Sequence, residues 1–132
     1  MPALKDVKTV GGGFSNAAEL VRVVYDFAKD GGALSDLDVL VADSDCVVSL
    51  KHMAVKTAVT SGGALVLDLG KGAGGTEFFS DKAVAALTLN SLHLTSAPAA
   101  VHLAKDEKVV LGIEGASATA GKLEMVFEVV RF

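Results

Sequence analysis

The amino-acid sequence predicts an all-β domain: a β-sandwich of jelly-roll or Greek-key type, with at most one short helix. Three observations support this class. Segments rich in valine, alanine and leucine alternate apolar and polar positions with a period of two, which is typical of strands with one buried face. Glycine-rich turns separate these segments at the roughly 8–12-residue spacing found in sandwiches. No repeated alternation of strand and helix occurs, which argues against a parallel α/β sheet.

The strands follow from this alternation. The first clear strand is expected at residues 19–28, where Val21, Val23, Tyr25 and Phe27 share one face. Each later strand is bounded by glycine-containing or other turn-forming segments. These strands are expected at residues 37–41, 46–59 (one long strand or two joined by a bend), 64–69, 92–95, 99–104, 108–114 and 122–132.

The segment at residues 77–89 carries two competing signals. Ser80 is a suitable N-cap for a short helix over residues 81–85. Residues 84–89 also fit a strand. We therefore expect a single helical turn that runs into a strand.

The first 18 residues differ from the rest of the chain. Three consecutive glycines, at residues 11–13, follow a short segment of mixed charge, and such a run loses much backbone entropy on ordering. We therefore expect an extended N-terminal arm with a glycine hinge at residues 1–18 and a β-sandwich domain at residues 19–132. Val7, Val10 and Phe14 are the expected contact anchors of this arm.

Composition limits the classes of function. The chain has 132 residues, which suits one domain, and 51% of them are hydrophobic, which leaves open that some apolar surface is buried against a partner. A net charge of −4 with no basic run argues against nucleic-acid binding, and no apolar stretch is long enough to cross a membrane as a helix. The single cysteine, Cys46, lies in an expected strand and is interpreted as a small buried hydrophobe.

No set of catalytic or metal-binding residues can be assembled from the sequence. Residues 115–122 come near a phosphate-binding loop, but they have one residue too many between the glycines and precede an expected strand. Glu77 and Asp81 form a conceivable acid pair without a second component. The spacing of the histidines fits no short metal-site motif, so they are interpreted as surface or strand-edge residues. Four clustered aspartates are interpreted as turn caps, with weak cation binding as the alternative: Asp36, Asp38, Asp43 and Asp45.

Phe78 and Phe79 are adjacent, and in a strand their side chains would point to opposite faces. One of them is then a candidate anchor for a contact with a partner protein or a second copy of the chain. The alternative, that both are buried in the core, stays open.

A series of turn and packing motifs runs along the chain: VYDFAKDGGA at 24–33, VKTAVTSGGA at 55–64, LVLDLG at 65–70, AVAALT at 83–88, LGIEGA at 111–116 and TAGK at 119–122. Their joint order, over residues 20–132, resembles that of small virion structural proteins of tailed bacteriophages, and most closely the capsid decoration (cement) proteins. These are jelly-roll proteins on the outer face of the phage head.

The resemblance implies a structural role and no enzyme activity. It implies a protein that is made in the host cytoplasm and bridges neighbouring major capsid subunits on the outside of the virion. The implied partners are the major capsid protein and further copies of this chain, with a homodimer favoured and a trimer possible. Neither nucleic acid nor a membrane is an expected partner, and no cofactor is expected. The alternatives are another phage structural component, such as a head fibre base or tail protein, and, less favoured, a carbohydrate-binding module, for which one tyrosine and no tryptophan offer few aromatic platforms.

Overall fold

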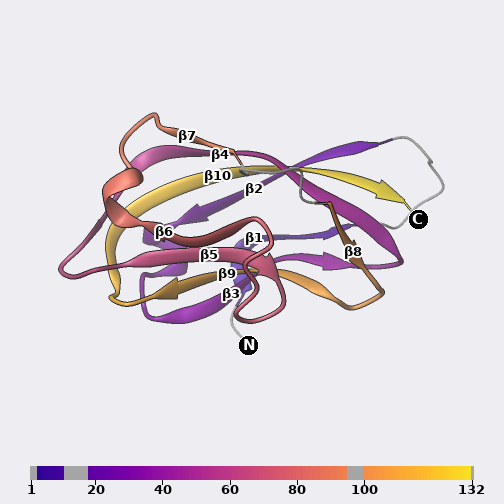
Figure 1. Cartoon of the computed structure of the whole chain (residues 1–132), viewed down its shortest axis with the longest axis horizontal. Helices are drawn as coiled ribbons and strands as arrows, with labels where there is room; N and C mark the ends of the chain where they lie inside the picture. The colour runs from indigo at the N-terminus through magenta and orange to yellow at the C-terminus, as the bar shows by residue number, and fades with distance from the viewer. Residues whose placement is uncertain (1–2, 11–17, 95–99, 132) are drawn as a thin grey trace.

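The computed structural model describes residues 3–10, 18–94 and 100–131. Two β-sheets pack face to face in this part of the chain (Figure 1). The all-β sandwich prediction is therefore confirmed. The elements are β1 (Ala3–Val10), β2 (Glu19–Asp26), α1 (Phe27–Asp30), β3 (Ser35–Ala42), β4 (Cys46–Ser61), β5 (Val66–Lys71), β6 (Phe79–Ala83), the 3-10 turn η1 (Val84–Ala86), β7 (Leu92–His93), β8 (Ala100–Leu103), β9 (Lys108–Glu114) and β10 (Ala118–Arg131).

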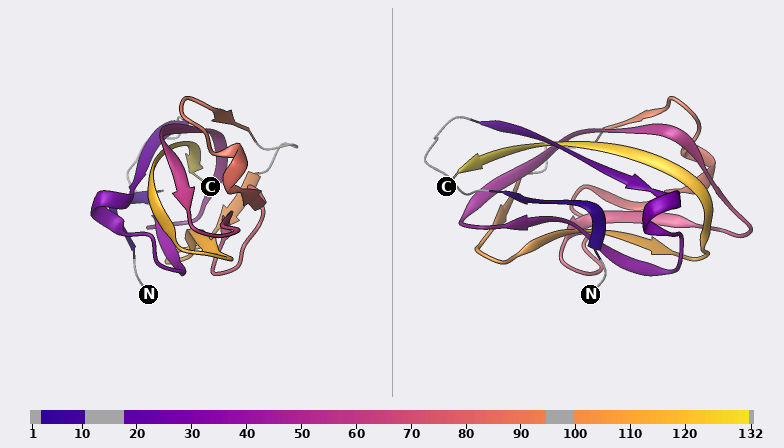
Figure 2. Two further views of the ribbon diagram at one scale, coloured as in Figure 1. Left: turned by 90° about the vertical axis from the view of Figure 1, so that its left-hand side faces the viewer. Right: turned by 180° about the vertical axis from the view of Figure 1, so that it is seen from behind.

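The two sheets have different strand orders. The first sheet runs β1-β3-β9-β5-β6, and the second runs β2-β10-β4, with β7 and β8 each pairing with part of β4. Every pair is antiparallel except β1 with β3. Figure 2 shows in its end-on view that the chain crosses repeatedly between the two layers. Most neighbouring strands are therefore distant in the sequence, as Greek-key connections require.

The long strands β4 and β10 form the centre of the second sheet. Their apolar side chains alternate with polar ones, and Met125 lies opposite Met53 with both fully buried. Phe127 is also fully buried and makes an edge-to-face contact with Phe78 at 5.9 Å between ring centroids. Each buried side chain of this size contributes about 1.5–3 kcal/mol relative to leaving it exposed. The alternation that predicted these strands thus also builds the core. Residues 46–59, for which one or two strands were possible, lie in one continuous strand.

Helix contributes little to this fold. The expected strand at 19–28 ends at Asp26, whose carboxylate accepts a hydrogen bond from the Ala28 N–H and caps the four-residue α1. Gly31, with φ of 76°, ends that turn. None of the helices among the described residues is long and apolar enough to cross a membrane.

The prediction for residues 77–89 has the right elements in the wrong order. The strand β6 comes first, and the helical turn η1 follows it. Phe79 anchors the strand because its side chain is buried in the core, and Ala83 pairs with Val66 of β5. Ser80 therefore lies inside a strand and caps no helix, and the N-cap of η1 is Ala83.

Residues 3–10, expected in an extended arm, are extended but belong to the sandwich. They form β1, which pairs in parallel with β3 at the edge of the first sheet. Leu4 and Val10 are both buried in the core. Their burial explains the pairing, since an arm free of the domain would leave both side chains in water. The glycines at residues 11–13, which were expected to act as a hinge, lie outside the described residues.

Candidate binding surfaces

The five residues expected as capsid or oligomer contacts are placed mostly in the interior. Val10, Phe78 and Phe79 are at most 5% exposed and belong to the hydrophobic core. Val7 is half-buried in β1, and Phe14 lies outside the described residues. The open alternative for the two phenylalanines, burial of both, is thus what the structure has. In this conformation Val10, Phe78 and Phe79 are core residues and offer no surface to a partner, which corrects the choice of these three as contact anchors.

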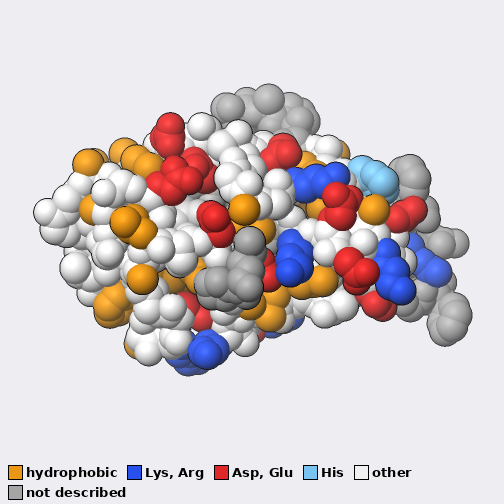
Figure 3. All heavy atoms as spheres, turned by 90° about the horizontal axis from the view of Figure 1, so that it is seen from below, with side chains coloured by type: hydrophobic (Ala, Val, Ile, Leu, Met, Phe, Trp, Pro, Cys, Tyr) orange, Lys and Arg blue, Asp and Glu red, His pale blue; other side chains and the backbone are white. Residues whose placement is uncertain are grey.

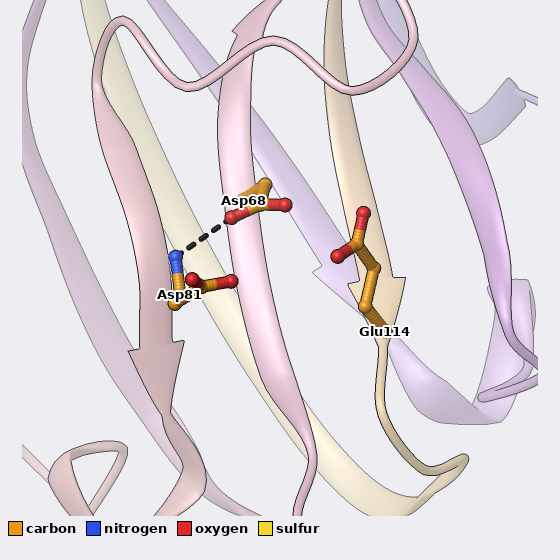
Figure 4. A group of neighbouring side chains, drawn as sticks. All are labelled: Asp68, Asp81 and Glu114. Carbon is orange, nitrogen blue, oxygen red and sulfur yellow. Dashed lines mark hydrogen bonds between the residues drawn. The ribbon is translucent and has the colours of Figure 1, made fainter.

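A cluster of three carboxylates lies on the outer face of the first sheet (Figure 4). Asp68, Asp81 and Glu114 come from the neighbouring strands β5, β6 and β9, and one oxygen of each lies within 4.8 Å of the others. Asp81 has φ of 51°, and its N–H donates to Oδ1 of Asp68 at 2.7 Å. Gly112 lies opposite Asp68, and its missing side chain leaves room for the carboxylates on either side. We call these three residues the acidic cluster.

The acidic cluster has an electrostatic cost. Repulsion from Asp68 is the main cause that raises the pKa of Glu114, with a hydrogen bond to Asp68, burial, and the charges of Asp81 and Asp36 adding to it. Asp68 itself is only 6% exposed, so water screens it poorly. A cluster of like charges relaxes either by taking up a proton or by attracting a cation.

We assign no metal to the acidic cluster. Ca²⁺ takes six to eight oxygen ligands and is usually held by backbone carbonyls as well as carboxylates. The cluster offers three side chains, of which two are exposed. Its existence was not visible in the sequence, because its members are 13 and 33 residues apart and only the strand order brings them together.

The aspartates singled out in the sequence are arranged differently from expectation. Asp36 and Asp38 lie within β3, so the interpretation of these two as turn caps is wrong. Asp38 is buried and pairs with Lys108 at 3.2 Å, which compensates its charge. Glu77 bonds to the backbone N–H of Lys71 and is not a member of the acidic cluster, so it forms no acid pair with Asp81.

The histidines are spread over three strands of the second sheet. His52 lies on β4, His93 on β7 and His102 on β8, and none belongs to the acidic cluster. His93 Nε2 lies 2.9 Å from Oγ of Ser91, which resembles the first half of a nucleophile–base pair. The Ser91 hydroxyl, however, is within 2.6 Å of the Thr88 carbonyl, to which it donates its proton. Ser91 and His93 therefore stabilise the loop before β7 through these hydrogen bonds.

Cys46 is fully buried in β4, as interpreted from the sequence. Burial raises the pKa of its thiol, and the charge of Asp45 adds to this effect. A raised pKa disfavours the thiolate, which is the form that acts as a nucleophile or metal ligand. Cys46 is therefore a packing residue.

Exposed leucines mark a second type of surface. Leu89, Leu92 and Leu94 flank or form β7 and are each about 60% exposed. Leu92 pairs opposite Ala54 at the edge of the second sheet, and His93 between the leucines turns inward toward Phe79. We call these three leucines the leucine ridge. Leucines clustered in this way are a common sign of a protein contact.

The outer face of the first sheet carries many charged side chains. Figure 3 views it from below, the side on which β3, β9 and β5 lie in Figure 1. Acidic side chains are spread across this face, and most of the basic side chains lie toward its right-hand end. The acidic cluster thus lies on the first sheet, whereas the leucine ridge lies at the edge of the second sheet. The other strands of the second sheet carry the ion pairs Arg22–Glu124 and Lys51–Glu128.

Comparisons with known proteins identify the architecture. No protein-family model matches this chain, and no curated protein matches it. Among solved structures, it is similar to a chain of the structure described as "Cyanophage Pam1 capsid asymmetric unit", with a TM-score of 0.58 and 15% sequence identity. The superposition covers 93% of this chain and 91% of that one. At this identity the likeness shows a shared fold, which extends over nearly the whole length of both chains.

Proposed function

We propose that this protein is a structural component of a phage virion that binds the outside of the head and cements neighbouring major capsid subunits. The observation that carries the proposal is the end-to-end fold likeness to a chain of a cyanophage capsid structure. Because the two chains match over more than nine-tenths of each, the likeness concerns the whole sandwich and not a shared pair of strands.

The side chains of the chain are compatible with a binding role. In the part of the chain that the structure describes, Ser91, Glu77 and Asp38 are engaged in hydrogen bonds or an ion pair, and they form no nucleophile–base–orienter set. The leucine ridge, in contrast, leaves apolar surface in water. Burying such surface against a capsid subunit would be favourable at about 25 cal/mol per Å².

The test is reconstitution on heads that lack the protein. Purified chain is mixed with expanded shells from the source virus, and the mixture is separated by sedimentation through a gradient. We expect comigration that saturates at a fixed ratio to the major capsid subunit, and shells that resist higher temperature when loaded. A chain that stays at the top of the gradient and is found in tail or fibre fractions of intact virions would contradict cementing and indicate another structural role.

A further inference from the structure

We infer that the groove between β1 and β2 binds an extended, acidic segment of a partner protein. Each of these strands is the outer strand of its sheet, and they lie side by side where the two sheets meet at one corner of the sandwich (Figure 2). Two adjoining cavities of about 320 and 470 Å³ open along this corner. Both share Asp6 and Arg22, so they form one continuous groove. The inference does not depend on the proposed capsid role.

The edge of β2 presents unpaired backbone groups to this groove. In an antiparallel pair, alternate residues point their N–H and C=O away from the partner strand. The N–H groups of Val24 and Asp26 bond to carboxylates outside the second sheet, which shows that the even-numbered residues of β2 point away from β10. Leu20 and Arg22 share this direction, and no backbone hydrogen bond joins β2 to β1 among the described residues. An incoming strand can therefore pair with the backbone of Leu20 and Arg22.

The carboxylates that line the 320 Å³ cavity, those of Asp6, Asp26 and Asp30, each accept a hydrogen bond from a backbone N–H of this chain. Glu19 lines the 470 Å³ cavity as an exposed carboxylate. Asp6 accepts from the Val24 N–H at 2.9 Å and is ion-paired with Lys8. Asp30 accepts from the Lys5 N–H at 2.6 Å and from the Asp26 N–H at 2.9 Å. Asp30 therefore offers little to a ligand, since its oxygens are directed at the backbone of this chain.

The basic side chains of the groove are less committed. Lys5, Lys29 and Lys122 line the 320 Å³ cavity, and no carboxylate lies within 4 Å of their ammonium groups among the residues described. Arg22 has one partner, Glu124 at 3.3 Å. Val24 supplies an apolar contact between these charges. With the acids of the 320 Å³ cavity bonded to the backbone and its lysines without an acidic partner, this part of the groove favours a negatively charged occupant although the chain as a whole is acidic.

The two features together define the occupant. Unpaired strand-edge backbone selects an extended polypeptide over a helix or a small molecule. The three ammonium groups line the 320 Å³ cavity, which adjoins that edge at Arg22. They select acidic side chains at alternate positions of a peptide that spans both cavities, because alternate side chains of a strand point to the same side. The partner segment is therefore an extended peptide in which acidic residues alternate with apolar ones.

The experiment uses the full-length chain and three synthetic peptides. The first is fluorescein-labelled Glu-Val-Glu-Val-Glu-Val, the second replaces each glutamate by lysine, and the third carries N-methyl groups on alternate backbone nitrogens of the first. Fluorescence anisotropy at low ionic strength measures binding, and amide shifts in NMR spectra locate it. We expect saturable binding of the first peptide, with shifts at Leu20 and Arg22, and binding at least about tenfold weaker for the other two. No saturable binding of the acidic peptide, or equal binding of all three, would overturn the inference.

Two matched pairs of variants separate charge from backbone pairing. Lys29→Glu with Lys122→Glu is compared with Lys56→Glu with Lys105→Glu, which makes the same change in net charge at exposed lysines outside the groove lining. Arg22→Pro removes an outward N–H at a sheet edge, where proline is tolerated, and is compared with Arg22→Ala. We expect the first member of each pair to bind the acidic peptide about tenfold more weakly than the second. If either pair binds equally while circular dichroism shows both members folded, the corresponding half of the inference is wrong.

Discussion

The two corners at which the sheets meet are closed in different ways. At the β6/β7 corner, Phe79 and Leu87 are buried, and the Phe79 ring contacts the His93 ring edge-on at 6.4 Å between centroids. The backbone of residues 84–91 is also bonded to β4, for example from the Val59 N–H to the Leu87 carbonyl at 3.0 Å, and to Leu65 directly before β5. At the β1/β2 corner, the connections are carboxylates, with Asp6 and Asp30 accepting from backbone N–H groups.

This difference separates two ways of protecting a sheet edge. Apolar burial closes the β6/β7 corner and leaves little of its backbone for a partner. Carboxylates satisfy some N–H groups of the β1/β2 corner and leave others facing an open groove. Exposed strand edges are sites at which other chains add strands. The β1/β2 corner is thus suited to binding, and the β6/β7 corner to stability.

Phe79→Ala should have the largest effect, because it opens the closed corner. Truncating a buried phenylalanine costs about 3–5 kcal/mol through lost burial and the cavity that remains. The lost contacts include the His93 ring and the Lys82 ammonium, which lies 4.9 Å from the ring centroid. Equilibrium unfolding in urea measures the change in the free energy of unfolding.

Leu89→Ala is the matched control, since this side chain is 60% exposed. Its free energy of unfolding should lie within about 0.5 kcal/mol of the original chain. A loss below about 1 kcal/mol for Phe79→Ala would mean that burial of this side chain does not hold the corner.

Asp30→Ala should have the next largest effect, at the open corner. It removes the acceptor for the Lys5 and Asp26 N–H groups. Hydrogen bonds to charged groups contribute about 1.5–3 kcal/mol each, and partial exposure to water reduces this, so we expect a loss of about 1–2 kcal/mol. The same urea titration measures it, and Asp30→Asn, which keeps one oxygen, should recover part of the loss. Equal losses for both variants would show that the hydrogen bonds are not the cause.

Periodicity explains why most of the fold was predictable. The alternation of Val109, Leu111 and Ile113 gave β9 its bounds and its inward face, and the structure buries all three. The order of the elements at residues 77–89 was predicted wrongly, because a local capping signal there competes with burial of a side chain in the core. Ser80 has a good capping side chain, but the burial of its neighbour Phe79 outweighs a cap, which is worth about 1 kcal/mol.

The binding surfaces were less predictable, for a reason of topology. Asp68 and Glu114 lie in strands that the sequence predicts, but the sequence does not show that β5 and β9 are neighbours. The groove likewise depends on β1 and β2 belonging to different sheets although they are consecutive in the chain. Long-range strand order leaves no local pattern, so these surfaces needed the structure.

Acidification should weaken the two corners at different pH values. Burial, followed by the charge of Lys82, lowers the pKa of His93, against a hydrogen bond with the Ala86 backbone that raises it. The unfolded chain then binds more protons than the folded chain, so stability falls as the pH drops below the ordinary histidine value of about 6.5. For Asp6, burial alone would raise the pKa, but hydrogen bonds from Lys8 and Val24 and the charges of Lys8 and Arg22 outweigh it and lower the pKa. The contribution of Asp6 to the stability of the fold is present above the ordinary aspartate pKa of about 3.9 and is lost as the pH falls through the lowered pKa of Asp6.

Amide hydrogen exchange, corrected for the intrinsic rate at each pH, resolves the two corners. Protection at Val59, whose N–H bonds to Leu87, should decline from about pH 6.5 downward, and protection at Val24 only below about pH 4. His93→Phe should abolish the first decline and leave the second. Simultaneous loss at both amides in the original chain would contradict the assignment of the first step to His93.

Of these substitutions, Leu92→Ser should change the free energy of unfolding least and should weaken binding to the phage head most. Leu92 is 61% exposed, so its loss should alter the free energy of unfolding by no more than about 0.5 kcal/mol. On the proposed function, the leucine ridge is the apolar surface that a capsid subunit would cover, and a hydroxyl there would weaken head binding. Leu34→Ser is the matched control because Leu34 is 57% exposed and lies in the connection between α1 and β3, which is not part of the ridge. Gradient sedimentation with shells should show reduced occupancy for Leu92→Ser and full occupancy for Leu34→Ser, whereas equal occupancy would place the head contact on another face, with the β1/β2 groove as the next surface to test.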